Sequence, residues 1–252
     1  MSVILNENEW AANMINNKSL GKKPFETLRL VARYYLDKGY KPGDVRKMLD
    51  SFLVTCDPSA SLSRWSDVID AALHKAKQNL AVAIDHIDIT EPEMNRILAI
   101  ESKQGQRLAF TLLCLAKYWL IVTPRADGWV NSKDSEIMSM ANIKTSIKRQ
   151  SAIYHTLNNL GLIQFSKRVD NTNVKVCFIE PGKTVLSITD FRNLGNQFNN
   201  YCGVPGYIKC SVCGIMIKKT GRQQKYCKSC ATEMQIMCIA KHAKAKREEK
   251  TA

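Results

Sequence analysis

Residues 210–230 read CSVCGIMIKKTGRQQKYCKSC and decide the fold of the C-terminal part of the chain. They hold two CxxC pairs, which are separated by the thirteen residues 214–226. A segment of this length can fold back as a short hairpin, so that four thiolates converge on one tetrahedral ion. The spacing therefore predicts one structural Zn²⁺, with the ligands Cys210, Cys213, Cys227 and Cys230. Four protein ligands would leave no open coordination position, which argues against a catalytic ion.

The residues around the cysteines indicate how this module folds. We expect residues 215–219 to pair with the segment around Gln224, across a turn at Thr220 and Gly221. From Ala231 onward the sequence is helical, so the second cysteine pair would stand at a helix start, where the helix dipole favours thiolate. This order resembles a treble-clef zinc finger. The alternative is a plain zinc ribbon, with the second pair on another hairpin.

Positive charge is concentrated in the same part of the chain. The 252 residues carry a formal net charge of +14, and residues 207–252 contribute +8 of it. Counterion release draws clustered positive charge to phosphate-rich partners, although a solubilising tail has the same composition. In this module we expect nucleic-acid contacts from Lys218, Lys219, Arg222, Lys241 and Lys244.

The composition predicts a soluble protein of the cytoplasm. Hydrophobic residues make up 45% and charged residues 24% of the chain, which is ordinary for a globular domain. Residues 1–10 lack a basic start and an apolar core, so we expect no secretory signal and no membrane partner. Nine cysteines without such a signal indicate a reducing compartment.

Hydrophobic periodicity predicts a mainly helical α+β protein in three parts. These are an N-terminal helical domain (1–80), a winged-helix-like domain (90–202) and the zinc-binding module (207–252). The segment 203–206, Gly-Val-Pro-Gly, is the clearest linker. Thr90 and Glu93 have the spacing of a capping box and predict a helix start.

The first part reads as three helices, which begin at Pro24, before Val45 and near Trp65. It resembles the small helical module at the C-terminus of some phage and plasmid primases. The resemblance rests on Leu28-x-x-Val31-Ala32-x-x-Tyr35, Gly39 and Val45-x-x-Met48-Leu49.

The middle part has the element order of a winged helix-turn-helix. A buried helix ends near Pro124, Asn131 caps a short helix, and a third helix runs from Thr145 or Ser146 to Gly161. Strands at 162–165 and 174–178 follow, joined by a polar loop. A further strand is expected at 185–188, and Thr189 would cap a last short helix.

The third of these helices has two faces. Ile153, Leu157 and Leu160 should point inward, which leaves a polar stripe for a major groove. The expected contacts from this helix, its turn and the wing are Lys144, Lys148, Arg149, Ser151, His155, Asn159, Lys167 and Arg168. The alternative is a winged helix used for protein docking or dimerisation.

Three blocks resemble uncharacterised zinc-finger proteins encoded by prophages and other mobile elements of Gram-positive bacteria. They are residues 108–117, 188–195 and 225–230. The resemblance implies a phage or mobile-element context and carries no activity with it.

These features predict a non-catalytic, zinc-containing DNA-binding protein that acts in replication or transcription control. Its partner would be nucleic acid, most simply double-stranded DNA. The alternative is a phage-encoded interaction protein that inhibits or redirects a host nucleoprotein complex, such as a defence nuclease or RNA polymerase. We do not expect an enzyme, because the sequence has no GxxxxGK[ST] loop, no paired catalytic acids and no Cys–His arrangement.

Overall fold

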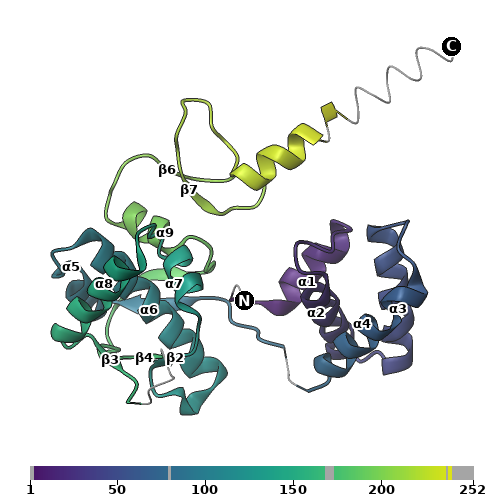
Figure 1. Cartoon of the computed structure of the whole chain (residues 1–252), viewed down its shortest axis with the longest axis horizontal. Helices are drawn as coiled ribbons and strands as arrows, with labels where there is room; N and C mark the ends of the chain where they lie inside the picture. Colours follow the sequence, from purple (N-terminus) through teal and green to yellow (C-terminus); the bar gives the residue numbers. More distant parts are fainter. Residues whose placement is uncertain (1–2, 79–80, 168–172, 237, 240–252) are drawn as a thin grey trace. The chain divides into compact units, whose positions relative to one another are not determined.

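The computed structural model describes residues 3–78, 81–167, 173–236 and 238–239. The chain divides into two compact units, Val3–His86 and the part from Ile87 onward (Figure 1). Helices predominate and the sheets are small, so the mixed α+β class predicted from the sequence is confirmed. Each unit is described here by itself.

The first unit consists of four helices: α1 (Glu7–Asn16), α2 (Pro24–Asp37), α3 (Pro42–Cys56) and α4 (Leu62–Ala76). Proline opens both α2 and α3, where its missing N–H costs no hydrogen bond. The buried face of α2 packs against the other three helices. Helix α1, which the sequence pattern did not predict, is held to α2 by buried Arg33, whose Nη1 donates to Glu7 Oε2 at 2.6 Å.

The second unit is built around α6 (Lys103–Val122), most of whose side chains are buried. Strand β1 (Ile87–Thr90) pairs antiparallel with β5 (Thr184–Ile188), and α5 (Glu91–Leu98) follows β1 directly. The predicted capping box is confirmed: the backbone N–H of Thr90 donates to Glu93 Oε2 at 2.8 Å. Glu93 is completely buried and lies at the junction of these elements.

A second group of elements follows α6. Its members are a 3₁₀ turn (Pro124–Ala126), β2 (Trp129–Val130), α7 (Asp134–Met140), α8 (Ile147–Asn159), β3 (Ile163–Phe165) and β4 (Val174–Val176). The three strands form one antiparallel sheet in the order β2-β4-β3. The sequence pattern did not predict the short β2. It pairs with β4, whose residues lie more than forty positions further along the chain.

Two sequence predictions about these helices are wrong. The N-cap of α7 is Lys133 rather than Asn131, so the helix starts later than expected. Leu160 is 55% exposed instead of inward-facing, because α8 ends at Asn159 and Gly161 then turns the chain with φ +69°. Tyr154 is buried in addition to the expected Ile153 and Leu157.

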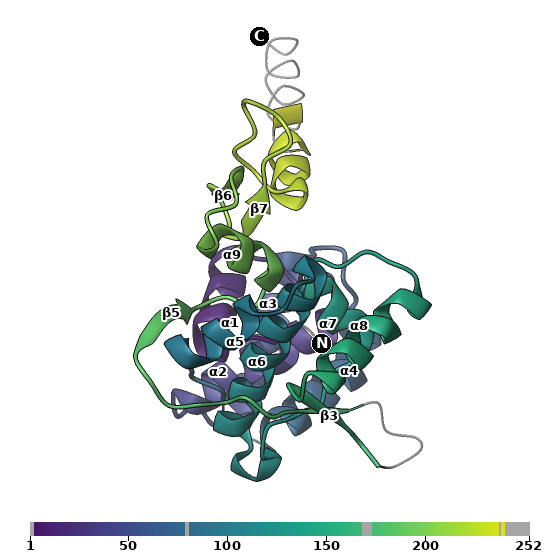
Figure 2. The same ribbon diagram turned by 90° about the vertical axis from the view of Figure 1, so that its left-hand side faces the viewer.

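The last labelled elements are α9 (Leu194–Tyr201), β6 (Tyr207–Lys209) and β7 (Met216–Lys218). The N-cap of α9 is Asn193 with a left-handed φ of +54°, not Thr189. Strand β7 pairs with β6, not with the segment around Gln224 as predicted from the sequence. Residues 228–236 are helical, and Figure 2 shows β6 and β7 beside α9.

Candidate functional site

The structure brings the four cysteines of the two CxxC pairs into one cluster. Their ligand atoms all lie within 4.8 Å of one another, with Cys210 and Cys230 buried and the other two half-buried. The sulfur atoms of Cys213 and Cys227 are 3.7 Å apart. Because Zn–S bonds are about 2.3 Å long, neighbouring sulfur atoms in a tetrahedral zinc site stand about 3.8 Å apart. The cluster can therefore hold a metal ion without rearrangement of this pair.

The first cysteine pair forms the connection of the β6–β7 hairpin. The Cys210 N–H donates to Ile215 O and the Gly214 N–H to Cys210 O, both at 2.9 Å. Gly214 has a φ of +71°, which a glycine adopts without strain. The hairpin thus closes through the knuckle itself, and this is why β7 takes β6 as its partner.

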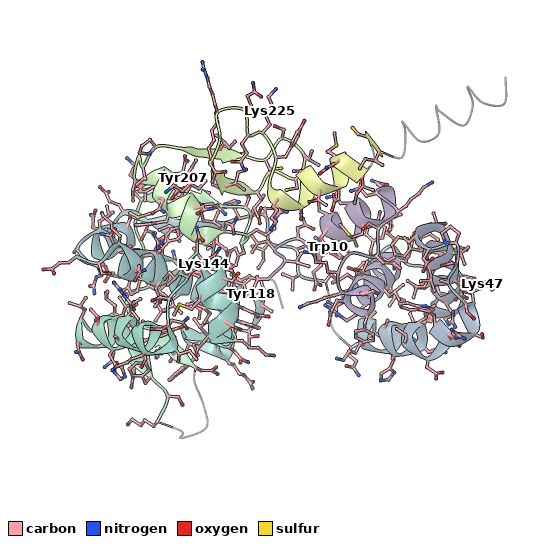
Figure 3. All side chains as sticks on the ribbon, turned by 45° about the horizontal axis from the view of Figure 1, so that its top comes forward. Trp10, Lys47, Tyr118, Lys144, Tyr207 and Lys225 are labelled. Atoms are coloured by element: carbon pink, nitrogen blue, oxygen red, sulfur yellow. The ribbon has the colours of Figure 1, made fainter. Side chains whose placement is uncertain are left out.

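The second pair stands at the start of the helix of residues 228–236. The Ala231 N–H donates to Cys227 O at 2.9 Å, and the Cys227 N–H points to the sulfur of Cys210 at 3.2 Å. The loop before it is tied to the knuckle by Ser211 N–H and Lys225 O at 3.0 Å. Lys225 is labelled in Figure 3. Knuckle and helix start are therefore joined by backbone contacts as well as by the sulfur cluster.

The protein environment prepares the sulfur atoms unequally. Burial opposes ionisation of Cys210, but the backbone N–H groups of Cys213, Cys227 and Val212 outweigh it and lower its pKa to about 6. Burial raises the pKa of Cys213 and, together with the neighbouring thiols, that of Cys230. The thiol of Cys210 therefore ionises more readily than those of Cys213 and Cys230. A cation that binds the cluster would have to displace protons from these two thiols.

Side chains of α9 and of the turn before it hold the cysteine module across the predicted linker. Arg192 Nη2 donates to Cys213 O at 2.7 Å, and Asn193 Nδ2 and Asn196 Nδ2 both donate to Met216 O at 3.1 Å. Asn199 Nδ2 donates to Tyr207 Oη at 2.8 Å. Sequence reasoning missed all four, because single polar residues in a short helix carry no periodic signal. The module is thus hydrogen-bonded to α9 and not joined to it by the linker alone.

The residues predicted to contact nucleic acid lie at two places. Around α8, the exposed ones are Lys144, Lys148, Arg149, Ser151, His155, Asn159 and Lys167. In the cysteine module, Lys218, Lys219 and Arg222 are exposed on β7 and the loop after it. Arg168, Lys241 and Lys244 lie outside the described residues. No ion pair to another described residue engages Lys144, Lys148 or Arg149.

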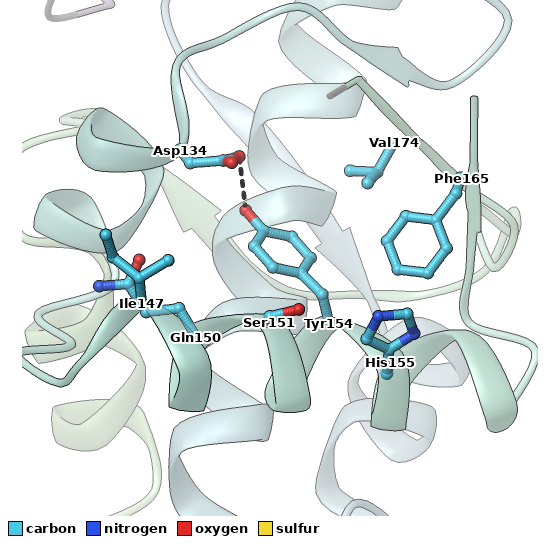
Figure 4. A pocket seen from close by; sticks show the side chains of 8 residues that line it. All are labelled: Asp134, Ile147, Gln150, Ser151, Tyr154, His155, Phe165 and Val174. Atoms are coloured by element: carbon cyan, nitrogen blue, oxygen red, sulfur yellow. Dashed lines mark hydrogen bonds between the residues drawn. The ribbon is translucent and has the colours of Figure 1, made fainter. Parts of the chain in front are cut away.

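A pocket of about 380 Å³ opens along one face of α8 (Figure 4). It is lined by Asp134, Ile147, Gln150, Ser151, Tyr154, His155, Phe165 and Val174. The Tyr154 hydroxyl donates to Asp134 Oδ1 at 3.3 Å, and burial with this contact raises the Tyr154 pKa. The rings of His155 and Phe165 lie 5.1 Å apart, which joins α8 to β3. Both polar and apolar groups thus line this face.

Ile147 is an exposed apolar residue of this face that sequence reasoning missed. It is 83% exposed, although it stands in the first turn of α8 between the cations Lys144 and Lys148. Helical periodicity alone cannot single it out, because an apolar residue beside a helix start reads as a core position. The exposed side chain of Ile147 therefore adds an apolar contact site to a mainly polar surface.

Comparison with protein-family models, curated proteins and solved structures gave no match. Within the described residues, no helix is both long and apolar enough to cross a membrane.

Proposed function

We propose that this protein is a non-catalytic, zinc-containing DNA-binding protein in which α8 enters the major groove. The observation that carries the proposal is the arrangement around α8. Helix α6, strand β2, helices α7 and α8, and strands β3 and β4 follow one another in the order of a winged helix-turn-helix. The outer surface of α8 carries cations that no described carboxylate neutralises.

The exposed groups on this surface match the chemistry of DNA. Lys148 and Arg149 suit phosphate oxygens or guanine edges, while Ser151 and Asn159 can hydrogen-bond to bases. The exposed Ile147 suits the methyl group of thymine. An α8 placed in the groove would thus combine backbone contacts with base contacts.

The four-cysteine cluster would hold one Zn²⁺ in a structural role. The distance between the Cys213 and Cys227 sulfur atoms fits a tetrahedral ion, and all four donors are thiols, which zinc accepts readily. Cys210, Cys213, Cys227 and Cys230 would be the ligands; the bound ion would join the knuckle to the helix start, as in a treble-clef finger. Lys218, Lys219 and Arg222 on the module would add phosphate contacts.

A phage or mobile-element setting, with a role in replication or transcription control, fits the resemblance of the three sequence blocks described above. In that setting the DNA would be that of the element or of its bacterial host, in the cytoplasm.

We expect the double variant Lys148→Glu/Arg149→Glu to bind DNA at least about tenfold more weakly at about 100 mM salt, because two phosphate contacts become repulsive. The slope of log affinity against log salt concentration should fall by about 2. Fluorescence anisotropy with a labelled 30-base-pair duplex measures both quantities.

The matched control for this measurement is Lys47→Glu/Lys77→Glu, which makes the same charge change at exposed lysines of the first unit (Lys47 is labelled in Figure 3). The control should keep most of the affinity. If both double variants bind like the unchanged protein, or lose affinity equally, α8 is not the DNA-contacting element.

A second candidate function is that of an interaction protein that inhibits or redirects a host nucleoprotein complex. The observation in its favour is the exposure of large apolar side chains, among them Ile147 on α8, Val212 on the knuckle and Ile236 on the last helix. Such a contact would be less sensitive to salt than phosphate binding. A pull-down from host lysate with nuclease treatment separates the two, since only a protein contact survives removal of nucleic acid.

A further inference from the structure

A pair of asparagines connects the cysteine knuckle to the turn that precedes α8. Asn196 of α9 is only 4% exposed and has hydrogen bonds on both sides of its amide. Its Nδ2 donates to Met216 O at 3.1 Å, and its Oδ1 accepts from Asn142 Nδ2 at 2.8 Å. Asn142 and Met216 belong to segments far apart in the chain, so one buried side chain bridges them.

Asn142 sits where the chain turns from α7 into α8. It has a left-handed φ of +51°. The turn is closed by a hydrogen bond from the Ile143 N–H to Met138 O at 2.9 Å. The start of α8 at Ile147 follows five residues later. Because the turn sets the direction in which α8 leaves α7, any contact that holds Asn142 also helps to hold α8.

The backbone of α9 lies directly against the same turn. A Cβ atom added at Gly195 would stand 2.1 Å from Ala141 O and 2.5 Å from Ala141 C, closer than any side chain permits. The absence of a side chain at Gly195 is therefore required for this approach, and it brings the neighbouring Asn196 within reach of Asn142. Helix α9 is thus in contact with the turn through both backbone and side chain.

Side chains of α9 and of the turn before it also hold the knuckle near the cysteines. Met216 O accepts from both Asn193 and Asn196, and Arg192 holds Cys213 O at 2.7 Å. Cys213 is one of the four clustered cysteines, and Met216 is the first residue of β7, three positions further on. The acceptors that α9 and the preceding turn contact are therefore carbonyl groups whose positions a bound ion would fix.

We propose that Asn196 is a positioning residue that couples metal binding at the four cysteines to the position of α8. A bound ion fixes the knuckle, the knuckle orients Asn196 through Met216 O, and Asn196 holds the turn through Asn142. This coupling rests on the proposed metal binding and not on the proposed DNA binding. Because coupling is reciprocal, a contact that holds the turn in its metal-bound position must also strengthen metal binding.

The experiment uses the full chain and the variant Asn142→Gly. Glycine keeps the left-handed backbone and removes only the side chain that reaches Asn196. The control is Asn199→Ala, which removes another contact between α9 and the module, to Tyr207, without touching the turn. Hydrogen exchange of the α8 amides is measured with Zn²⁺ bound and after removal by a chelator.

In the unchanged protein and in Asn199→Ala, metal removal should speed exchange in α8 at least about fivefold, while β1 and β5 serve as the internal reference. In Asn142→Gly this ratio should fall toward one. A ratio near one in the unchanged protein, or an unchanged ratio in Asn142→Gly, overturns the coupling. Failure of the chain to bind metal is seen directly and refutes the zinc proposal instead.

Metal affinity provides a second measurement that stays informative if chelation loosens the reference strands as well. Competition with a chromophoric chelator should show affinity for Zn²⁺ about three- to tenfold weaker in Asn142→Gly, the effect of one lost hydrogen bond. Asn142 lies outside the four-cysteine cluster, so a change of zinc affinity in this variant reports the connection between the cluster and the turn. Equal affinities in Asn142→Gly and the unchanged protein overturn the proposal.

Discussion

The double variant Cys227→Ser/Cys230→Ser is expected to lose the proposed zinc site and, with it, the fold of the cysteine module. Among residues 207–236, the buried apolar positions are Cys210, Ile217 and Cys230, and two of these are proposed ligands. So small a core cannot hold the β6–β7 hairpin by hydrophobic burial. Structural zinc in small finger peptides contributes about 10–16 kcal/mol, which far exceeds what the remaining contacts supply.

Two measurements test this expectation. Elemental analysis should find about one zinc per chain in the unchanged protein and none in the variant. Limited digestion with trypsin should cut the variant at least about tenfold faster at Lys209, Lys218, Lys219 and Arg222, because local unfolding exposes their backbone. The first unit should be cut at its usual rate.

The matched control is Cys238→Ser, at an exposed cysteine outside the cluster. It should retain both the metal and the protected digestion pattern. A metal-free unchanged protein, or an unaltered digestion pattern in the double variant, would refute the structural role of the ion.

Replacing Lys117 by Met is expected to lower the stability of the second unit by about 3–5 kcal/mol, because it strands a buried carboxylate. Glu93 is fully buried, and its Oε2 accepts from Lys117 Nζ at 2.6 Å. Lys117 Nζ also donates to Asp88 O at 2.6 Å, and Glu93 Oε1 accepts from Glu180 N–H at 3.1 Å. The pair thus joins β1, α5 and α6 to the segment before β5.

Thermal unfolding followed by circular dichroism measures the loss. For a unit of this size, about 3–5 kcal/mol corresponds to a melting transition roughly 6–20 °C lower. The double variant Glu93→Gln/Lys117→Met should recover part of the loss, since the unpaired charge is gone. The surface-pair variant Lys175→Met, which releases the exposed Asp127, should cost less than about 1 kcal/mol. Equal shifts in Lys117→Met and Lys175→Met would contradict the argument.

Local sequence signals predicted several of the helix starts. The capping box at Thr90 and Glu93 and the proline at the start of α2 stand where the pattern indicated. Short-range hydrogen bonds and fixed proline geometry decide such features, so neighbouring residues suffice to predict them. The predicted caps of α7 and α9 were wrong. The observed N-caps, Lys133 and Asn193, make no side-chain capping hydrogen bond, so the side-chain signal on which the prediction relied does not mark these helix starts.

Strand pairing and side-chain contacts required the tertiary structure. The turn residues Thr220 and Gly221 suggested a hairpin after β7, yet β7 pairs with β6, and the knuckle connects these two strands. The pairing partner of a strand depends on loop closure and on neighbouring elements, and the sequence of the strand alone contains neither. The same holds for β2, which pairs with a strand more than forty residues away.

By itself, the sequence determined that four cysteines would gather, because two CxxC pairs thirteen residues apart can reach one point wherever the module lies. Only the tertiary structure decided what the cluster touches. Asn142 and Asn196 meet at 2.8 Å across fifty-four positions of sequence, and Gly195 lets α9 approach the turn before α8. Such a contact arises from the packing of whole helices. No local sequence pattern could therefore predict that hydrogen bonds connect the cysteine module to the turn before α8.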